Sequence, residues 1–159
     1  MTSSFFEYKK PKVIQALRYH FISRKEIKVM VILINVFAIF SASLFYLKKV
    51  SPAAFLLSSV LWFFLMVLFW FLLPTIIYKR SRSFKDRFRI IANDDSLTLE
   101  HERASKQFRW AEFSTWMESP HFFHIYFNST SFFLIPKDAF VNDEENEARK
   151  IFASKIKKQ

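Results

Sequence analysis

The chain has 159 residues, including 22 Phe but no Gly and no Cys. Without Cys it has no disulfide framework, thiolate zinc site or cysteine nucleophile, and without Gly it lacks the common phosphate-binding loops and nucleophile elbows. Residues 1–28 and 79–89 each carry a net charge of +5, whereas residues 90–159 carry −2. Because the positive charge flanks apolar segments, we expect no nucleic-acid-binding surface.

The first 28 residues are expected to form a short strand and then a helix. Residues Ser3 to Tyr8 have the composition of a strand, and Pro11 suits the first turn of a helix. Apolar residues then recur with roughly helical spacing, as at Val13 and Ala16. We expect this helix to lie on the membrane or to dock on the C-terminal domain.

Two uncharged runs, residues 29–47 and 53–78, predict a transmembrane hairpin over 29–78. About 20 apolar residues cross the hydrocarbon core as a helix, and both runs are close to that length or exceed it. Twelve Lys/Arg residues lie on the terminal side within residues 10–28 and 79–89, and two lie in the loop between the runs, so both termini are expected to be cytoplasmic. A buried core helix, or cleavage of a signal peptide near Ser41, fits the pattern less well, because long polar and basic segments flank the runs.

A few polar residues interrupt the apolar runs and predict close packing of the two helices. They are Asn35, Ser41, Ser43, Ser58 and Ser59. The serines fall at similar depth, and small residues let helices approach. Asn35 can form a hydrogen bond to the other helix of the pair or to another copy of the chain, so a homo-oligomer remains an alternative. Pro74 is expected to kink or end the second helix, with water and Tyr78 satisfying the freed carbonyls.

Six basic residues follow the second run and are assigned to the membrane surface. They are Lys79, Arg80, Arg82, Lys85, Arg87 and Arg89. They set the topology, and in the alternative interpretation they also hold the soluble domain against anionic headgroups. Arg87 and Arg89 alternate with Phe88 and Ile90, which predicts a basic strand face.

Alternating apolar and polar residues over 84–140 predict five or six short antiparallel strands. Turns are expected at residues 93–96, 104–105, 119–120 and 128–129. Trp116 has the opposite parity to Phe113, Thr115 and Met117, so it is expected on the exposed face, at the lipid interface.

The C-terminal residues predict an amphipathic helix. Asn142 or Asp143 is expected to cap it, acidic residues fill its first turns and Lys residues its last, as the helix dipole favours. An apolar stripe runs along one side, made of Ala148, Ile151, Phe152 and Ile156. We expect this stripe to pack on the open face of a sheet or partial barrel.

Together these features resemble the YcxB-like family of small bacterial membrane proteins. The resemblance rests on the overall layout and on the runs Trp110-Ala111-Glu112-Phe113, His121 to Phe127, Ile135-Pro136-Lys137-Asp138-Ala139-Phe140 and Glu144-Glu145. It implies a bacterial inner-membrane protein in which residues 79–159 form a pleckstrin-homology-like barrel with a capping helix. The family carries no established biochemical activity.

The remaining candidates for chemistry are weak, so we expect no enzyme activity, cofactor or metal. His121 and His124 fall on opposite faces of a strand, unlike a metal-binding pair. The acidic residues of the strands are read as a solvated face; they are Glu100, Glu102, Glu112 and Glu118. The expected function is a membrane-anchored binding or scaffolding module, whose partners are the lipid bilayer and a membrane or cytoplasmic protein. The alternative is an accessory subunit of a transporter or envelope complex that contacts its partners through the hairpin.

Overall fold

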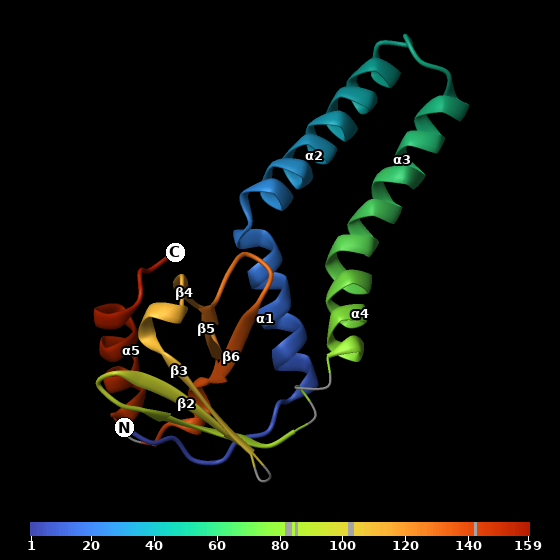
Figure 1. Cartoon of the computed structure of the whole chain (residues 1–159). Helices are drawn as coiled ribbons and strands as arrows, with labels where there is room; N and C mark the ends of the chain where they lie inside the picture. Colours follow the sequence, from blue (N-terminus) through green and yellow to red (C-terminus); the bar gives the residue numbers. More distant parts are fainter. Residues whose placement is uncertain (82–83, 85, 102–103, 142) are drawn as a thin grey trace. The chain divides into compact units, whose positions relative to one another are not determined.

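The computed structural model describes residues 1–81, 84, 86–101, 104–141 and 143–159, and Figure 1 labels their helices and strands. The chain divides into two compact units. The β unit comprises Met1–Ala16 and Ser81–Gln159, and the helical unit comprises Leu17–Arg80. The division falls inside helix α1, which spans Lys10–Ser23.

The helical unit contains two long apolar helices, as the sequence predicted. The first is α2 (Lys25–Tyr46), and the second is formed by α3 (Pro52–Val67), a π-helical segment η1 (Leu68–Leu72) and α4 (Leu73–Arg80). Both are long and apolar enough to cross a membrane, and over their described residues 25–46 and 52–80 Ser41 and Pro74 alone are buried. Each helix extends past the charged end of its uncharged run, because α2 begins at Lys25 and α4 ends at Arg80. Lys, Arg and Glu interrupt an apolar stretch but are good helix formers, so the helix continues through them.

The hairpin turns without glycine. Lys48 takes a left-handed backbone conformation (φ 55°) just after α2. Its N–H donates to the Phe45 carbonyl at 3.0 Å, and the Lys49 N–H donates to the Leu44 carbonyl at 2.9 Å, which is the Schellman pattern of helix ends. On the other side of the turn the Ser51 hydroxyl accepts a hydrogen bond from the Ala54 N–H and caps α3.

We expect Lys48→Gly to stabilise the helical unit. A residue with a Cβ loses about 1–2 kcal/mol in the left-handed region, and glycine loses part of this gain through backbone entropy. A net gain of about 1 kcal/mol should raise the thermal midpoint of the full chain in detergent. Lys49→Gly removes the same charge without this backbone benefit, and an equal rise in that variant would contradict the argument.

In its described residues the β unit contains six strands in two three-stranded antiparallel sheets. The first sheet has the order β1 (Phe88–Ala92), β2 (Ser96–His101), β3 (Ala104–Arg109), and the second has β4 (Thr115–Glu118), β5 (Phe122–Tyr126), β6 (Phe132–Pro136). The turn expected at 104–105 was wrong, because residues 104 and 105 both belong to β3. Ala104 already pairs with His101 at the end of β2, so pairing between the strands outweighs the local preference of Ala104-Ser105 for a turn.

Each end of the chain covers the edge of one sheet: the N-terminal segment runs along β1, and the C-terminal tail runs along β4. The N–H of Phe6 donates to the Phe88 carbonyl at 2.8 Å, and that of Ser3 donates to the Ile90 carbonyl at 2.9 Å. The N-terminal segment thus forms isolated bridges beside β1 rather than the regular strand that its composition suggested. Along β4, the N–H of Trp116 donates to the Lys157 carbonyl at 2.9 Å. Covered edges are protected from pairing with other chains.

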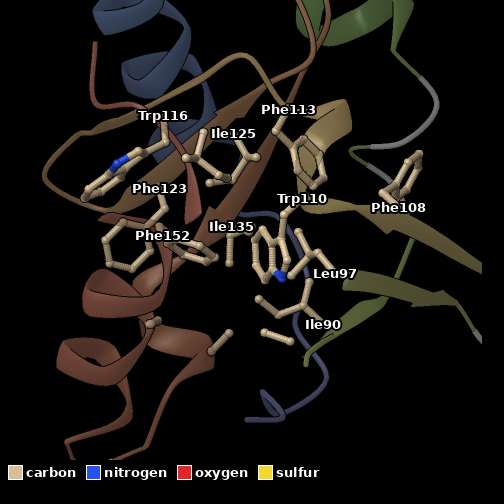
Figure 2. Close-up of a cluster of buried hydrophobic side chains, with 14 of the residues drawn as sticks. Ile90, Leu97, Phe108, Trp110, Phe113, Trp116, Phe123, Ile125, Ile135 and Phe152 are labelled. Carbon is tan, nitrogen blue, oxygen red and sulfur yellow. The ribbon is translucent and has the colours of Figure 1, made fainter. Parts of the chain in front are cut away.

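Helix α5 (Glu144–Lys155) packs on the β unit through its predicted stripe. Phe152 is fully buried, and its ring lies 5.3 Å from that of Phe123 and 6.2 Å from that of Trp116 (Figure 2). Asp143 precedes the helix but its side chain caps nothing; instead Glu144 accepts a hydrogen bond from the Val141 N–H at 3.0 Å. The other predicted cap, residue 142, lies outside the described residues.

The expectation of an exposed Trp116 was wrong, because only 1% of this residue is exposed. A 3₁₀ turn, η3 (Trp110–Glu112), and two irregular residues separate β3 from β4. Strand alternation therefore does not carry through from Phe113, and the parity argument fails. The C-terminal tail also covers the indole, with the Lys158 Nζ 5.5 Å from the ring centroid.

Candidate functional site

The predicted basic cluster is divided between the two units: Lys79 and Arg80 belong to the helical unit, and Arg87 and Arg89 belong to the β unit. Lys79 and Arg80 are exposed at the end of α4, whereas residues 82 and 85 lie outside the described residues. Arg87 precedes β1 and pairs with Glu7 (Nε–Oε1 3.0 Å). Of the two residues expected on a basic strand face, Arg89 belongs to β1 and Arg87 lies one residue before it.

Arg89 is held by neighbours of the β unit. Its Nε donates to Glu100 Oε2 at 2.6 Å, and its guanidinium lies 4.8 Å from the centroid of the Phe5 ring. The Arg89 hydrogen bond lowers the pKa of the Glu100 carboxyl. An arginine that is paired with a carboxylate attracts anionic headgroups less strongly. A membrane role of the basic cluster therefore stays a prediction, and it rests mainly on Lys79 and Arg80.

The structure brings together one pair of the predicted intramembrane residues. The hydroxyls of Ser41 and Ser58 lie 2.7 Å apart across α2 and α3, close to the stacked rings of Phe45 and Phe55. The remaining two serines bond inside their own helices, to the carbonyls of Ile39 and Phe55. The antiparallel register derived from the short loop thus places one serine pair in contact.

Asn35 also links the two helices. Its Nδ2 donates to the Val31 carbonyl at 2.8 Å, one turn earlier, and its Oδ1 accepts from the Trp62 Nε1 at 3.4 Å. Both polar atoms of the amide are therefore used within the hairpin, as is preferred where water is absent.

A contact that the sequence did not reveal satisfies the backbone at Pro74. Proline has no N–H, so the carbonyl four residues earlier, that of Trp70, loses its helical donor. The Nε of Arg18 donates to this carbonyl at 2.9 Å, and its guanidinium lies 5.4 Å from the centroid of the Trp70 ring. The π-helical segment η1 lies at the same place. Arg18 thus supplies a donor that the sequence analysis did not anticipate; the freed carbonyl was predictable, but this partner was not.

A second polar cluster ties α5 to the second sheet. Glu118 on β4 accepts from both Arg149 on α5 (Nη2–Oε1 2.8 Å, Nε–Oε2 3.1 Å) and Lys137 (Nζ–Oε1 2.5 Å). Arg149 also donates to Glu145 at 2.6 Å. The two cations lie over the ring of Phe123. Arg149, followed by Lys137, lowers the pKa of Glu118 to about 2.

The predicted family-motif residues are mostly core. Trp110 and Phe113 are buried, and the Trp110 indole N–H donates to the Asn93 carbonyl at 2.9 Å. Three others are buried around the end of β6: Ile135, Pro136 and Phe140. Lys137 alone brings a charge, and it serves the Glu118 cluster. The motif therefore describes how the β unit packs.

The candidates for chemistry have structural partners. His124 is buried in β5, and its Nε2 lies 2.9 Å from the Ser119 hydroxyl. That hydroxyl in turn donates to the Phe122 carbonyl at 3.2 Å, so the serine proton is not directed at the imidazole. His121 is exposed and lies just outside the strand.

The three described acidic residues of this set have partners in the β unit too. Glu100 and Glu118 are in the ion pairs described above, and Glu112 accepts from the Arg109 N–H at 2.8 Å. The fourth, residue 102, lies outside the described residues. Among the residues that the structure describes, no group of three His, Cys, Asp or Glu side chains is arranged to hold a metal ion.

Comparison with known proteins identifies the C-terminal part of the chain. A family model described as YcxB-like protein matches residues 92–152, a range that contains every motif on which the resemblance rested. No curated protein and no solved structure matches the chain. The match covers β2 to β6 and most of α5, and it does not extend to the helical unit. Residues 92–152 are therefore a YcxB-like region, as the sequence motifs predicted.

Proposed function

We propose that this protein is a membrane-anchored, non-catalytic binding module. The observation that carries the proposal is the helical unit, in whose two long apolar helices almost no side chain is buried. A core helix of a water-soluble protein would be buried, and a signal sequence would account for only the first of the two helices. A bilayer removes this apolar surface from water, and the hairpin then holds the β unit at the membrane surface.

The distribution of charge supports an orientation with both termini in the cytoplasm of a bacterial cell. Within residues 10–28 and 79–89, twelve Lys/Arg residues flank the terminal side of the hairpin, against Lys48 and Lys49 in its loop. The β unit would then lie on the inner face of the membrane. Its two antiparallel sheets with a C-terminal helix packed on their core support the proposal of a pleckstrin-homology-like partial barrel.

Reporter fusions test the topology. A fusion after Gln159 is expected to be active only for a cytoplasmic reporter, and an insertion at Ser51 only for an external one. Alkaline phosphatase and green fluorescent protein activities give the measurement, since the first requires export and the second requires the cytoplasm. An external Gln159 would refute the orientation, and a chain recovered in the soluble fraction would refute the anchoring.

A second candidate function places the contact with partners in the hairpin itself. A cavity of about 440 Å³ opens between α2 and α3, and its lining includes the small or polar residues Asn35, Ala38, Ala42, Ser58 and Ser59. Small residues allow another helix to approach closely, which suits an accessory subunit of a transporter or envelope complex.

Replacing the hairpin separates the two functions. The helical unit is exchanged for an unrelated two-helix hairpin, and partners are recovered from mild detergent by affinity purification. Partners retained by the exchanged chain support the binding module, whereas partners lost with the hairpin support the accessory subunit. The unaltered chain and the unrelated hairpin alone are the controls.

A further inference from the structure

A cavity of about 440 Å³ lies within the helical unit, between the end of α1, the start of α2 and the η1 region. Its wall is almost entirely apolar, with Val31 on one side and Trp62, Met66 and Trp70 on the other. The volume falls within the range of about 300–1,000 Å³ that is typical of ligand sites. An apolar space of this kind accommodates a hydrocarbon chain.

Two cations line the same cavity, Arg18 and Lys28. Neither has an acidic partner among the residues that the structure describes. Arg18 uses its Nε for the Trp70 carbonyl, and this bond holds its guanidinium beside the cavity. The planar fork of arginine leaves further donors that can bind a phosphate. The cavity therefore combines an apolar wall with unneutralised positive charge.

The place of the cavity along the chain matches the boundary between headgroups and acyl chains. Lys28 is the last charged residue before the first uncharged run. Indole rings favour the same interfacial level, and the ring of Trp70 lines the cavity beside Arg18. If the hairpin spans the bilayer, as proposed above, a lipid phosphate lies at this level and its acyl chain lies next to it.

We propose that this cavity binds one anionic phospholipid, with an acyl chain against Val31 and Trp62 and the phosphate at Arg18 and Lys28. Basic pockets at the cytoplasmic ends of transmembrane helices are suited to anionic headgroups. The π-helical segment contributes by placing Trp70 and its carbonyl where Arg18 can reach them, and such segments often occur at functional sites. This inference rests on the proposed membrane anchoring.

The test compares lipid binding by the full chain and two charge variants in mild detergent. Phosphatidylglycerol and phosphatidylcholine with identical acyl chains are added in equal amounts, and native mass spectrometry counts the bound lipid. The wild-type chain should retain one phosphatidylglycerol in preference to phosphatidylcholine. Lys28→Gln should weaken phosphatidylglycerol binding about five-fold, the effect of one surface charge. Lys25→Gln removes an equal charge from the same helix outside the cavity lining and should leave binding within two-fold.

A third variant tests the apolar wall. Val31→Phe fills part of the cavity and should lower the retention of both lipids, with far-UV circular dichroism showing that the helices remain. Equal loss in the two lysine variants, equal binding of both lipids by the wild-type chain, or full retention by Val31→Phe would each overturn the inference. In these three outcomes the chain is still recovered from membranes, whereas a chain found in the soluble fraction would instead refute the anchoring.

Discussion

Replacement of Phe152 by Asp is expected to unfold the β unit while the helical unit remains in the membrane fraction. Phe152 is fully buried between the rings of Trp110, Trp116 and Phe123. Truncating a buried Phe costs about 3–5 kcal/mol, and a carboxylate placed there adds the cost of an unpaired buried charge. The sum is comparable to the whole stability of a small domain, about 5–15 kcal/mol.

Limited proteolysis of the full chain in detergent measures this effect. The region after Ser81 should become protease-sensitive in Phe152→Asp, while the fragment that contains α2 and α3 stays intact. Ala153→Asp is the matched control, because it introduces the same charge at the next position of α5, which is exposed. Wild-type resistance in Phe152→Asp would mean that α5 is not docked on the sheets.

Glu118→Gln is expected to lower the free energy of unfolding of the β unit by about 1.5–3 kcal/mol, the range for hydrogen bonds to charged groups. The carboxylate of Glu118 joins Arg149 on α5 to Lys137, so its neutralisation weakens both links. Urea denaturation of the full chain in detergent, followed by Trp fluorescence, gives the measurement. Glu147→Gln removes an exposed charge from α5 and should change stability by less than about 1 kcal/mol. Equal effects in the two variants would remove the structural role of the Glu118 cluster.

The same cluster predicts a pH dependence. Because Arg149 and Lys137 lower the folded-state pKa of Glu118 from the ordinary value of 4.5 to about 2, the folded state binds its proton less readily than the unfolded state. The stabilisation is therefore complete above pH 4.5 and is lost as the pH falls towards 2. The difference in stability between wild type and Glu118→Gln should shrink over this interval. A difference that stays constant from pH 7 to pH 3 would contradict the assignment.

Much of the fold follows from the sequence, because the signals are local. The two uncharged runs define long apolar helices through their length alone, and alternation over 84–140 predicts five or six short strands, of which the structure describes six. The stripe of α5 likewise follows from residues one turn apart, and the motifs from Trp110 to Glu145 identify the YcxB-like region. Each of these features depends on the chemistry of neighbouring residues, so no knowledge of the packing is needed.

The tertiary structure decided what depends on residues far apart. The bond from Arg18 to the Trp70 carbonyl joins positions 52 residues apart, and that from Arg149 to Glu118 spans 31. Local alternation predicted an exposed Trp116, but the C-terminal tail and α5 bury it. The sequence shows that a carbonyl is freed by Pro74 or that a glutamate lies on a strand. Which side chain reaches it depends on how helices and sheets pack, because that packing sets the distances between groups that are remote in the chain.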